Sequence, residues 1–143
     1  MPKSGSISRR PPREPGKLHV NVVCTTPEAT RNALREAGRL AGNLDAQICL
    51  IAAQTVPYPL PLGRPDVPVE FTLDWLVGLA GEVNQAVRIV VTLCRDRNQA
   101  VLEQIRPGEL VVIGHTAGWW RSDSLRLGDW LGEQGISVVY AAH

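Results

Sequence analysis

Apolar and polar positions along this chain follow two periods. Short runs that are apolar at nearly every position are typical of strands buried on both faces. They alternate with stretches in which apolar residues recur every three or four positions, as in an amphipathic helix. The runs predict five strands, at 18–24, 47–55, 87–93, 110–113 and 136–142. The stretches between them predict four helices.

Capping residues support these helices. Thr26 is placed to cap the first helix, with Pro27 at its first position. Asp96 followed by Gln99 forms a capping box before a short third helix. Ser122 or Asp123 caps the fourth. The order β-α-β-α-β-α-β-α-β predicts an α/β fold, a five-stranded parallel sheet with helices on both faces, which is Rossmann-like.

Ligands of such sheets bind beyond the carboxyl ends of the strands, where the strand order reverses. The pattern leaves the strand order itself open, because a flavodoxin-like order would use the same elements. Between the second strand and the second helix, expected over 71–83, lies a proline-rich loop at 57–68. Such a loop is either functional or a rigid cover.

Charge divides the chain at residue 17. Residues 1–17 carry five basic residues and one acidic residue, a net charge of +4. Their Pro, Ser and Gly content predicts a disordered basic leader, which is either merely solvated or able to touch nucleic acid or anionic lipid. Residues 18–143 form the predicted domain and carry ten Arg against thirteen acidic residues, a net charge of −3. That balance argues against a nucleic-acid face on the folded domain.

No apolar run approaches the roughly 20 residues that cross a bilayer, and no signal peptide is recognisable. The three cysteines, Cys24, Cys49 and Cys94, end or interrupt apolar runs without metal-ligand spacing. We therefore expect buried thiols in a cytoplasmic protein without a membrane partner. The three histidines likewise show no metal-ligand spacing, so no metal is expected.

The last third holds the residues that suggest a function. The apolar run to Ile113 ends in Gly114 and His115, and Gly118 follows. A glycine loop between strand and helix is where phosphate groups usually lie. Trp119 and Trp120 come next, and their rings either stack on a ligand base, anchor a protein partner or pack over the sheet.

This order of elements, together with the glycine loop, resembles the universal stress protein (UspA-like) family. That family belongs to the adenine-nucleotide α-hydrolase-like class, and a similar domain occurs in potassium-sensing histidine kinases. Its nucleotide-binding branch has Gly, two residues, Gly, nine residues, and then Gly with Ser or Thr. Here Gly118 and Gly128 keep the gap of nine residues, Gly114 lies one residue too far upstream, and Asp129 replaces the hydroxyl residue.

These departures predict a degenerate nucleotide cleft. A carboxylate at Asp129 offers only acceptors and brings negative charge toward an anionic ligand. The branch also has an acidic residue just after its first strand, where this chain has Cys24, Thr25 and Thr26. We expect the residues that contact the cofactor to be Thr25, Thr26, Gly114, His115, Gly118, Gly128 and Asp129. The resemblance makes ATP the candidate cofactor, with no cofactor as the alternative.

The composition argues against catalysis. No lysine follows Lys17, which excludes a Walker lysine and a Schiff base in the domain. We therefore expect a non-catalytic stress-response or regulatory domain. An ATP-gated sensor and a small nucleotide-processing enzyme are the alternatives. The apolar strand Ile136 to Ala142 would lie at a sheet edge in the family arrangement, and the resemblance implies a homodimer through it.

Overall fold

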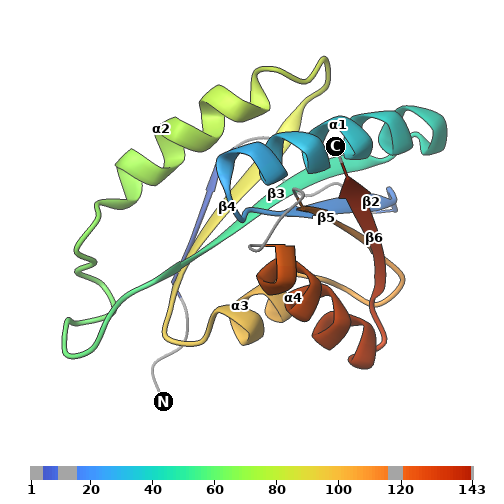
Figure 1. Cartoon of the computed structure of the whole chain (residues 1–143). Coiled ribbons are helices and arrows are strands. Elements are labelled where there is room, and N and C mark those ends of the chain that lie inside the picture. The colour runs from blue at the N-terminus through green and yellow to red at the C-terminus, as the bar shows by residue number, and fades with distance from the viewer. Residues whose placement is uncertain (1–4, 10–15, 116–120, 143) are drawn as a thin grey trace.

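The structure is a computed structural model, and it describes residues 5–9, 16–115 and 121–142. Within these residues, six strands form one sheet in the order β1-β4-β3-β2-β5-β6 (Figure 1). The strands are β1 (Gly5–Arg9), β2 (His19–Val23), β3 (Gln47–Thr55), β4 (Val87–Cys94), β5 (Leu110–His115) and β6 (Ser137–Ala142), and the helices are α1 (Pro27–Leu44), α2 (Val69–Ala80), α3 (Arg97–Glu103) and α4 (Arg121–Glu133).

The five strands β2 to β6 are parallel, which confirms the predicted α/β fold. The parallel part of the sheet begins in the middle with β2, runs outward through β3 and β4, and then returns to place β5 beside β2. This order excludes the flavodoxin-like alternative. The order reverses between β2 and β5, so a ligand is expected beyond the carboxyl ends of these two strands.

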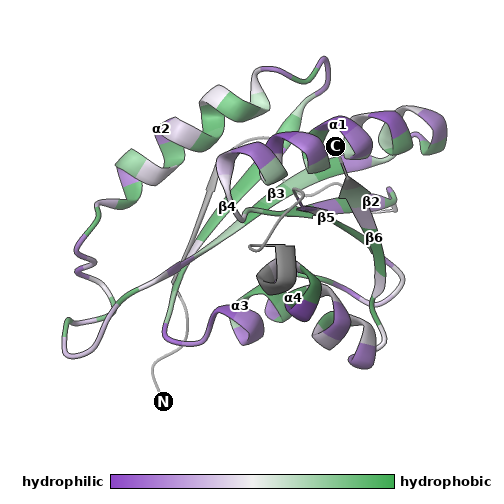
Figure 2. Ribbon diagram, in the orientation of Figure 1, coloured by the Kyte–Doolittle hydropathy of each residue, from purple (hydrophilic) through white to green (hydrophobic). Residues whose placement is uncertain are grey.

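Helices cover both faces of the sheet, with α1 and α2 on one face and α3 and α4 on the other (Figure 1). Because alternate residues of a strand point to opposite faces, each strand contributes to both cores. Val22 packs in the α1–α2 core, whereas its neighbour Val23 packs in the α3–α4 core. Figure 2 shows mainly hydrophobic strands between the helices; α1 carries much hydrophilic surface, whereas α2 is mixed, with Phe71 and Trp75 exposed.

The sequence prediction of a wholly disordered leader is wrong for Gly5–Arg9. These residues form β1, which pairs antiparallel with β4 from Gly5 opposite Leu93 to Arg9 opposite Ile89. Backbone hydrogen bonds hold an edge strand in place. A segment with little apolar content can therefore form an edge strand beside the backbone of an apolar strand. Residues 1–4 and 10–15 of the leader lie outside the described residues, and Gly16 and Lys17 lie shortly before β2.

Several predicted boundaries also change. The second helix, expected over 71–83, is Val69–Ala80. β5 extends to His115, two residues further than expected, because Gly114 and His115 pair with Ala141 and Ala142 of β6. Helix α4 begins at Arg121, so the expected capping residues Ser122 and Asp123 lie in its first turn. Within the described ranges, no helix combines the length and the apolar character that crossing a bilayer requires.

Candidate functional site

The turn after β2 is held by threonine hydroxyls. Thr26 caps α1 as predicted, its Oγ1 accepting a hydrogen bond from the backbone N–H of Ala29 at 3.2 Å. The backbone N–H of Thr25 donates to Oγ1 of Thr30 at 2.9 Å. Thr30 was not identified from the sequence, although its place one helical turn after Thr26 was the available signal. The hydroxyls of Thr26 and Thr30 thus hold the turn through hydrogen bonds to the backbone.

The thiol of Cys24 lies beside this turn. Thr30 Oγ1 lies 3.8 Å from its sulfur. Burial raises the pKa of this thiol to about 11, an effect that the hydrogen bond from Thr30 only partly opposes. Cys24 is therefore a neutral thiol at physiological pH, and a thiol must ionise to act as a nucleophile or metal ligand.

Gly114 permits a close approach between β5 and the first turn of α1. A Cβ atom at this position would lie 1.8 Å from the carbonyl oxygen of Ala29 and 2.7 Å from its carbonyl carbon. Both are backbone atoms, so no side-chain rotation can relieve the contact. The glycine that the sequence assigned to a phosphate loop therefore lies in a strand and has a packing role.

His115 ends β5 one residue after Gly114, so its side chain lies on the opposite face of the sheet. Its ring is half-buried and meets the ring of Tyr140 edge-on, with centroids 6.2 Å apart and planes at 68°. Its Nδ1 atom is buried without a hydrogen-bond partner, and so is Oγ1 of Thr25. These two polar atoms lie at the carboxyl ends of the neighbouring strands β5 and β2. Ligands of such sheets bind beyond these strand ends.

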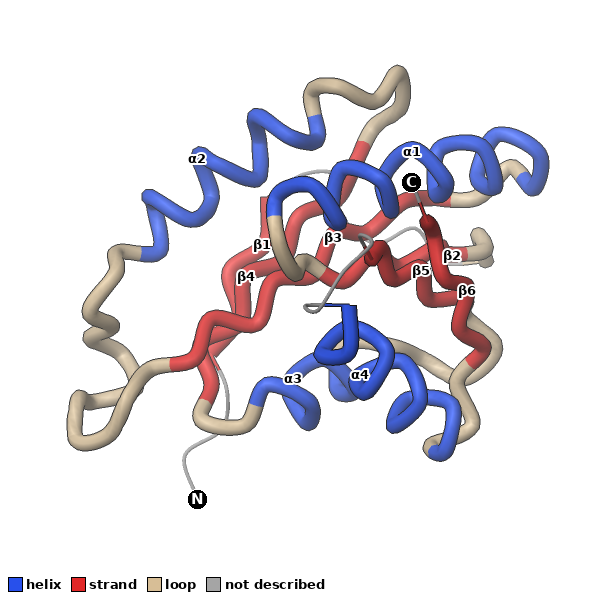
Figure 3. The backbone as a smooth tube through the Cα atoms, viewed as in Figure 1, coloured by secondary structure: helices blue, strands red, loops and turns tan. Residues whose placement is uncertain are grey.

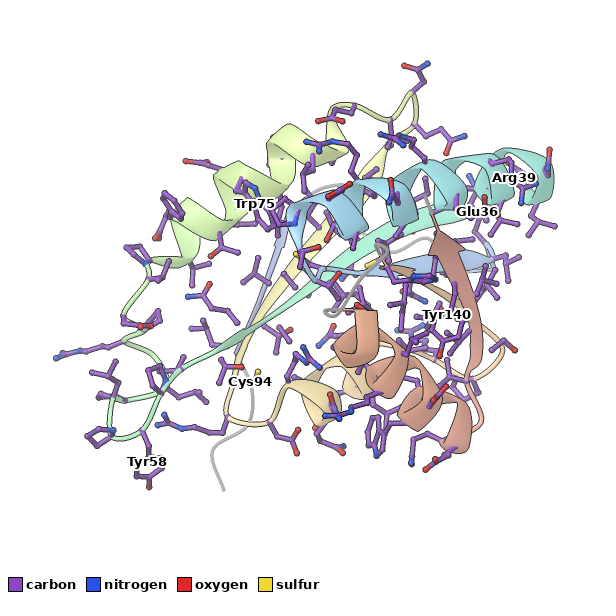
Figure 4. All side chains as sticks on the ribbon, in the orientation of Figure 1. Glu36, Arg39, Tyr58, Trp75, Cys94 and Tyr140 are labelled. Atoms are coloured by element: carbon purple, nitrogen blue, oxygen red, sulfur yellow. The ribbon has the colours of Figure 1, made fainter. Side chains whose placement is uncertain are left out.

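Gly128 and Asp129 lie elsewhere, about two turns into α4. A Cβ on Gly128 would lie 2.2 Å from the hydroxyl of Tyr140, so this glycine makes room for the Tyr140 side chain. The hydroxyl of Tyr140, a residue labelled in Figure 4, donates to Oδ1 of Asp129 at 3.0 Å. Because backbone N–H groups beyond the first turn of a helix are already bonded, Gly128 has none to offer a phosphate.

Tyr140 is a second residue that sequence analysis missed. Burial, the hydrogen bond to Asp129 and the charge of its carboxylate together raise the pKa of the phenol. The aspartate that the sequence assigned to the nucleotide cleft is thus bound to a strand residue of the same molecule. Gly118, Trp119 and Trp120 lie outside the described residues.

The proline-rich loop after β3 is pinned by one side chain from the β4–α3 turn. The guanidinium of Arg95 donates to the carbonyls of Val56 and Leu60 at 2.8 and 2.6 Å. It also stacks 4.7 Å from the ring centroid of Tyr58, which lies at the tip of the loop (Figure 4). The loop is a folded structure fastened to the carboxyl edge of β4.

Two cavities lie at the opposite, amino edge of the sheet. One, of about 240 Å³, lies between the end of α2 and the start of β4, and the other, of about 400 Å³, lies between the end of α1 and the start of β3. Gln85 and Ala86 line both. Neither cavity contains a residue that the sequence assigned to the nucleotide site. Among the residues whose placement is described, no cluster of His, Cys, Asp or Glu could hold a metal ion.

Similar solved structures are universal stress proteins. One from Burkholderia pseudomallei is 19% identical, with a TM-score of 0.57, and the match covers 90% of this chain and 98% of that one. One from Archaeoglobus fulgidus is 8% identical, with a TM-score of 0.58 and coverage of 87% and 93%. A universal stress protein in complex with cAMP is 17% identical, with a TM-score of 0.52 and coverage of 87% and 96%.

No family model and no curated protein matches the chain in sequence. The solved structures nevertheless align along nearly their whole length, so the resemblance to UspA-like proteins is confirmed at the level of the fold. At these identities the side chains that contact nucleotide in a relative do not transfer to this chain.

Proposed function

We propose that this chain is a non-catalytic regulatory domain of the universal stress protein type, with a degenerate nucleotide cleft at the carboxyl ends of β2 and β5. The observation that carries the proposal is the use of the cleft residues within the protein itself. Thr26 and Thr30 hold the β2 turn, and Gly114 contacts the backbone of Ala29. Asp129 is bound to Tyr140. Several groups that were expected to contact a nucleotide are thus engaged in internal contacts.

Electrostatics support the same conclusion. The thiol of Cys24 stands where the nucleotide-binding branch has an acidic residue, and it stays protonated at neutral pH. A neutral thiol is a weak hydrogen-bonding group and binds no Mg²⁺, which prefers oxygen ligands. The described end of β2 therefore supplies no carboxylate that could hold a Mg²⁺ ion beside a nucleotide.

Titration calorimetry with ATP and Mg²⁺ tests this proposal. We expect no binding heat up to millimolar ATP, and no ADP or AMP formed above a protein-free sample. Thr25→Trp places a bulky side chain at the end of β2, and Thr55→Trp places the same side chain at the exposed end of β3 as a control. Micromolar binding that Thr25→Trp abolishes and Thr55→Trp preserves would overturn the proposal.

The second candidate function is a nucleotide-binding sensor, which one observation favours. Thr25 Oγ1 and His115 Nδ1 are buried polar atoms without partners at adjacent strand ends. Buried polar groups are normally hydrogen-bonded, so a ligand with matching groups would satisfy both. The neighbour whose structure holds cAMP makes cyclic nucleotides a reasonable probe alongside ATP.

We also propose a homodimer through β6. This strand lies at an edge of the sheet, and Val138 and Val139 are half-buried there. A second copy would satisfy the outward-facing backbone groups of the strand. Trp119 and Trp120 remain candidates for contact with a protein partner.

A further inference from the structure

Helix α2 has apolar side chains on two of its sides. It packs on β4, toward one edge of the sheet, whereas α1 lies over β2 and β5 (Figure 3). Its inner side is buried through Val69, Leu73, Leu76 and Leu79. Phe71 and Trp75 are one helical turn apart on the other side, with 71% and 36% of their surface exposed. The only phenylalanine of the chain thus lies on the surface.

Two carboxylates lie beside these rings. Glu70 and Asp74 are exposed and are also one helical turn apart, so an acidic row runs next to the aromatic row. Neither carboxylate forms an ion pair with a residue that the structure describes. Glu70 favours the helix N-terminus from the first turn, but Asp74 lies beyond that turn. Like charges at this spacing destabilise a helix, so Asp74 beside Glu70 weakens α2.

An exposed glycine lies between the two rows. Gly78 is one helical turn beyond both Asp74 and Trp75, and a Cβ there would meet nothing within 4 Å. Its backbone is ordinary helix, in which glycine is less stable than alanine. Neither packing nor backbone conformation within the described chain therefore requires a glycine at this position. A missing side chain on a helix surface lets a second backbone approach closely.

We propose that Glu70, Phe71, Asp74, Trp75 and Gly78, the outer face of α2, bind an arginine-bearing amphipathic helix of another protein. The apolar side chains of that helix pack against the two rings, and the missing side chain at Gly78 leaves room for its backbone. The outer face of α2 is separate from the proposed nucleotide cleft, since β3 lies between β4 and β2.

The carboxylates determine the charge of the partner. A second copy of this chain would bring like charges to one interface, and nucleic acid or an anionic membrane would add its own negative charge. A positively charged helix instead complements Glu70 and Asp74. Arginine fits both rows, because its guanidinium pairs with a carboxylate and also stacks on an aromatic ring.

The test uses two fluorescein-labelled helical peptides with leucine at every third or fourth position, one with arginine and one with glutamate between the leucines. Fluorescence anisotropy measures their binding to the full chain. We expect the arginine peptide to bind and the glutamate peptide not to bind. Glu70→Gln with Asp74→Asn should weaken binding at least tenfold. Glu103→Gln with Glu133→Gln is the matched control, since it removes two exposed acids from α3 and α4, on the other face of the sheet.

Two further variants separate binding from folding. Phe71→Ala removes the exposed ring, and Gly78→Gln fills the space beside Trp75. Each should weaken binding of the arginine peptide at least tenfold. The melting temperature should stay close to that of the wild type in Phe71→Ala and should rise in Gly78→Gln, because glutamine is the better helix former.

No binding of the arginine peptide to the wild type, or equal affinity for the wild type and the α2 variants, would overturn the proposal. Equal binding of the glutamate peptide would also overturn it, because charge would then play no part. A dimer that Phe71→Ala dissociates in sedimentation would place a second copy on the outer face of α2 and would contradict the proposed partner.

Discussion

At the scale of single residues, glycines at two positions let distant parts of the chain approach each other closely. Thr26 was predicted as a cap and is one. Gly114 and Gly128 were assigned to phosphate contacts because glycines with that spacing line nucleotide loops. Both instead accommodate an atom of a distant element, Ala29 or Tyr140. A close approach between elements far apart in the chain leaves no local pattern, so the sequence could not distinguish the two uses of glycine.

Substitution of Gly114 by alanine should strongly destabilise the protein. The added Cβ would overlap the backbone of Ala29, so α1 must move away from β5 at a cost of about 3 kcal/mol or more. Gly132→Ala is the control, because a Cβ there meets nothing within 4 Å. Urea denaturation of both variants measures the difference. A Gly114→Ala variant as stable as the wild type would show that this packing contact is unimportant.

Cys24 should make stability depend on alkaline pH. Its pKa is about 11 in the folded chain against 9.0 for an unperturbed thiol, so the unfolded state ionises first. The stability that this thiol contributes is fully present below pH 9 and is lost as the pH rises toward 11. The loss is about 2 kcal/mol.

Denaturation of the wild type and of Cys24→Ala between pH 8 and pH 10.5 measures this effect. The free energies of unfolding of the two proteins should converge as the pH rises. Parallel curves would contradict the raised pKa. Alkylation of Cys24 in the folded wild type, located by mass spectrometry, should also rise steeply only well above pH 9.

At the scale of elements, the five parallel strands and the four helices were predictable because side-chain periodicity reports burial. The short strand β1 was not, since an edge strand is held by backbone groups that every residue carries. The proline-rich loop was recognisable as irregular, but its attachment was not. Arg95 follows β4, more than thirty residues after the loop begins, and only the parallel pairing of β3 with β4 brings the two together.

Arg95→Ala should release the loop while leaving the sheet intact. The substitution removes two hydrogen bonds to carbonyl oxygens and the stacking on Tyr58. Amides from Val56 to Leu60 should exchange at least tenfold faster, because local opening no longer breaks these contacts. Arg64→Ala, at an exposed arginine of the same loop, is the control. If these amides exchange at the same rate in Arg95→Ala as in the wild type, the prolines alone fix the loop.

At the scale of the whole molecule, the two edges of the sheet differ in which strands form them. β6 lies at one edge, and β1 covers β4 at the other. The strand order that creates this arrangement could not be predicted from the sequence. The five parallel strands have similar apolar runs, so the hydrophobic pattern does not show which strands are neighbours. The sequence resemblance supplied the expectation of β6 at an edge, and the sheet order confirms that position.

The proposed homodimer should be sensitive to charge on β6. Ser137 is exposed at the start of this strand, so Ser137→Lys adds a charge there without entering the core. Two copies would bring like charges to one interface, and the dimer dissociation constant should rise several-fold. Ser137→Thr is the matched control. Sedimentation at several concentrations measures the change, and a protein that is monomeric throughout would contradict this interface.

The central claim is that the residues at the carboxyl ends of β2 and β5 hold the fold together instead of a nucleotide. Amide chemical shifts of ¹⁵N-labelled protein, recorded during titration with ATP and Mg²⁺ and separately with cAMP, test it most directly. We predict that the amides of Thr25, Thr30 and His115 do not shift up to millimolar ligand. Saturable shifts confined to these amides would contradict the claim and identify the chain as a nucleotide-binding sensor.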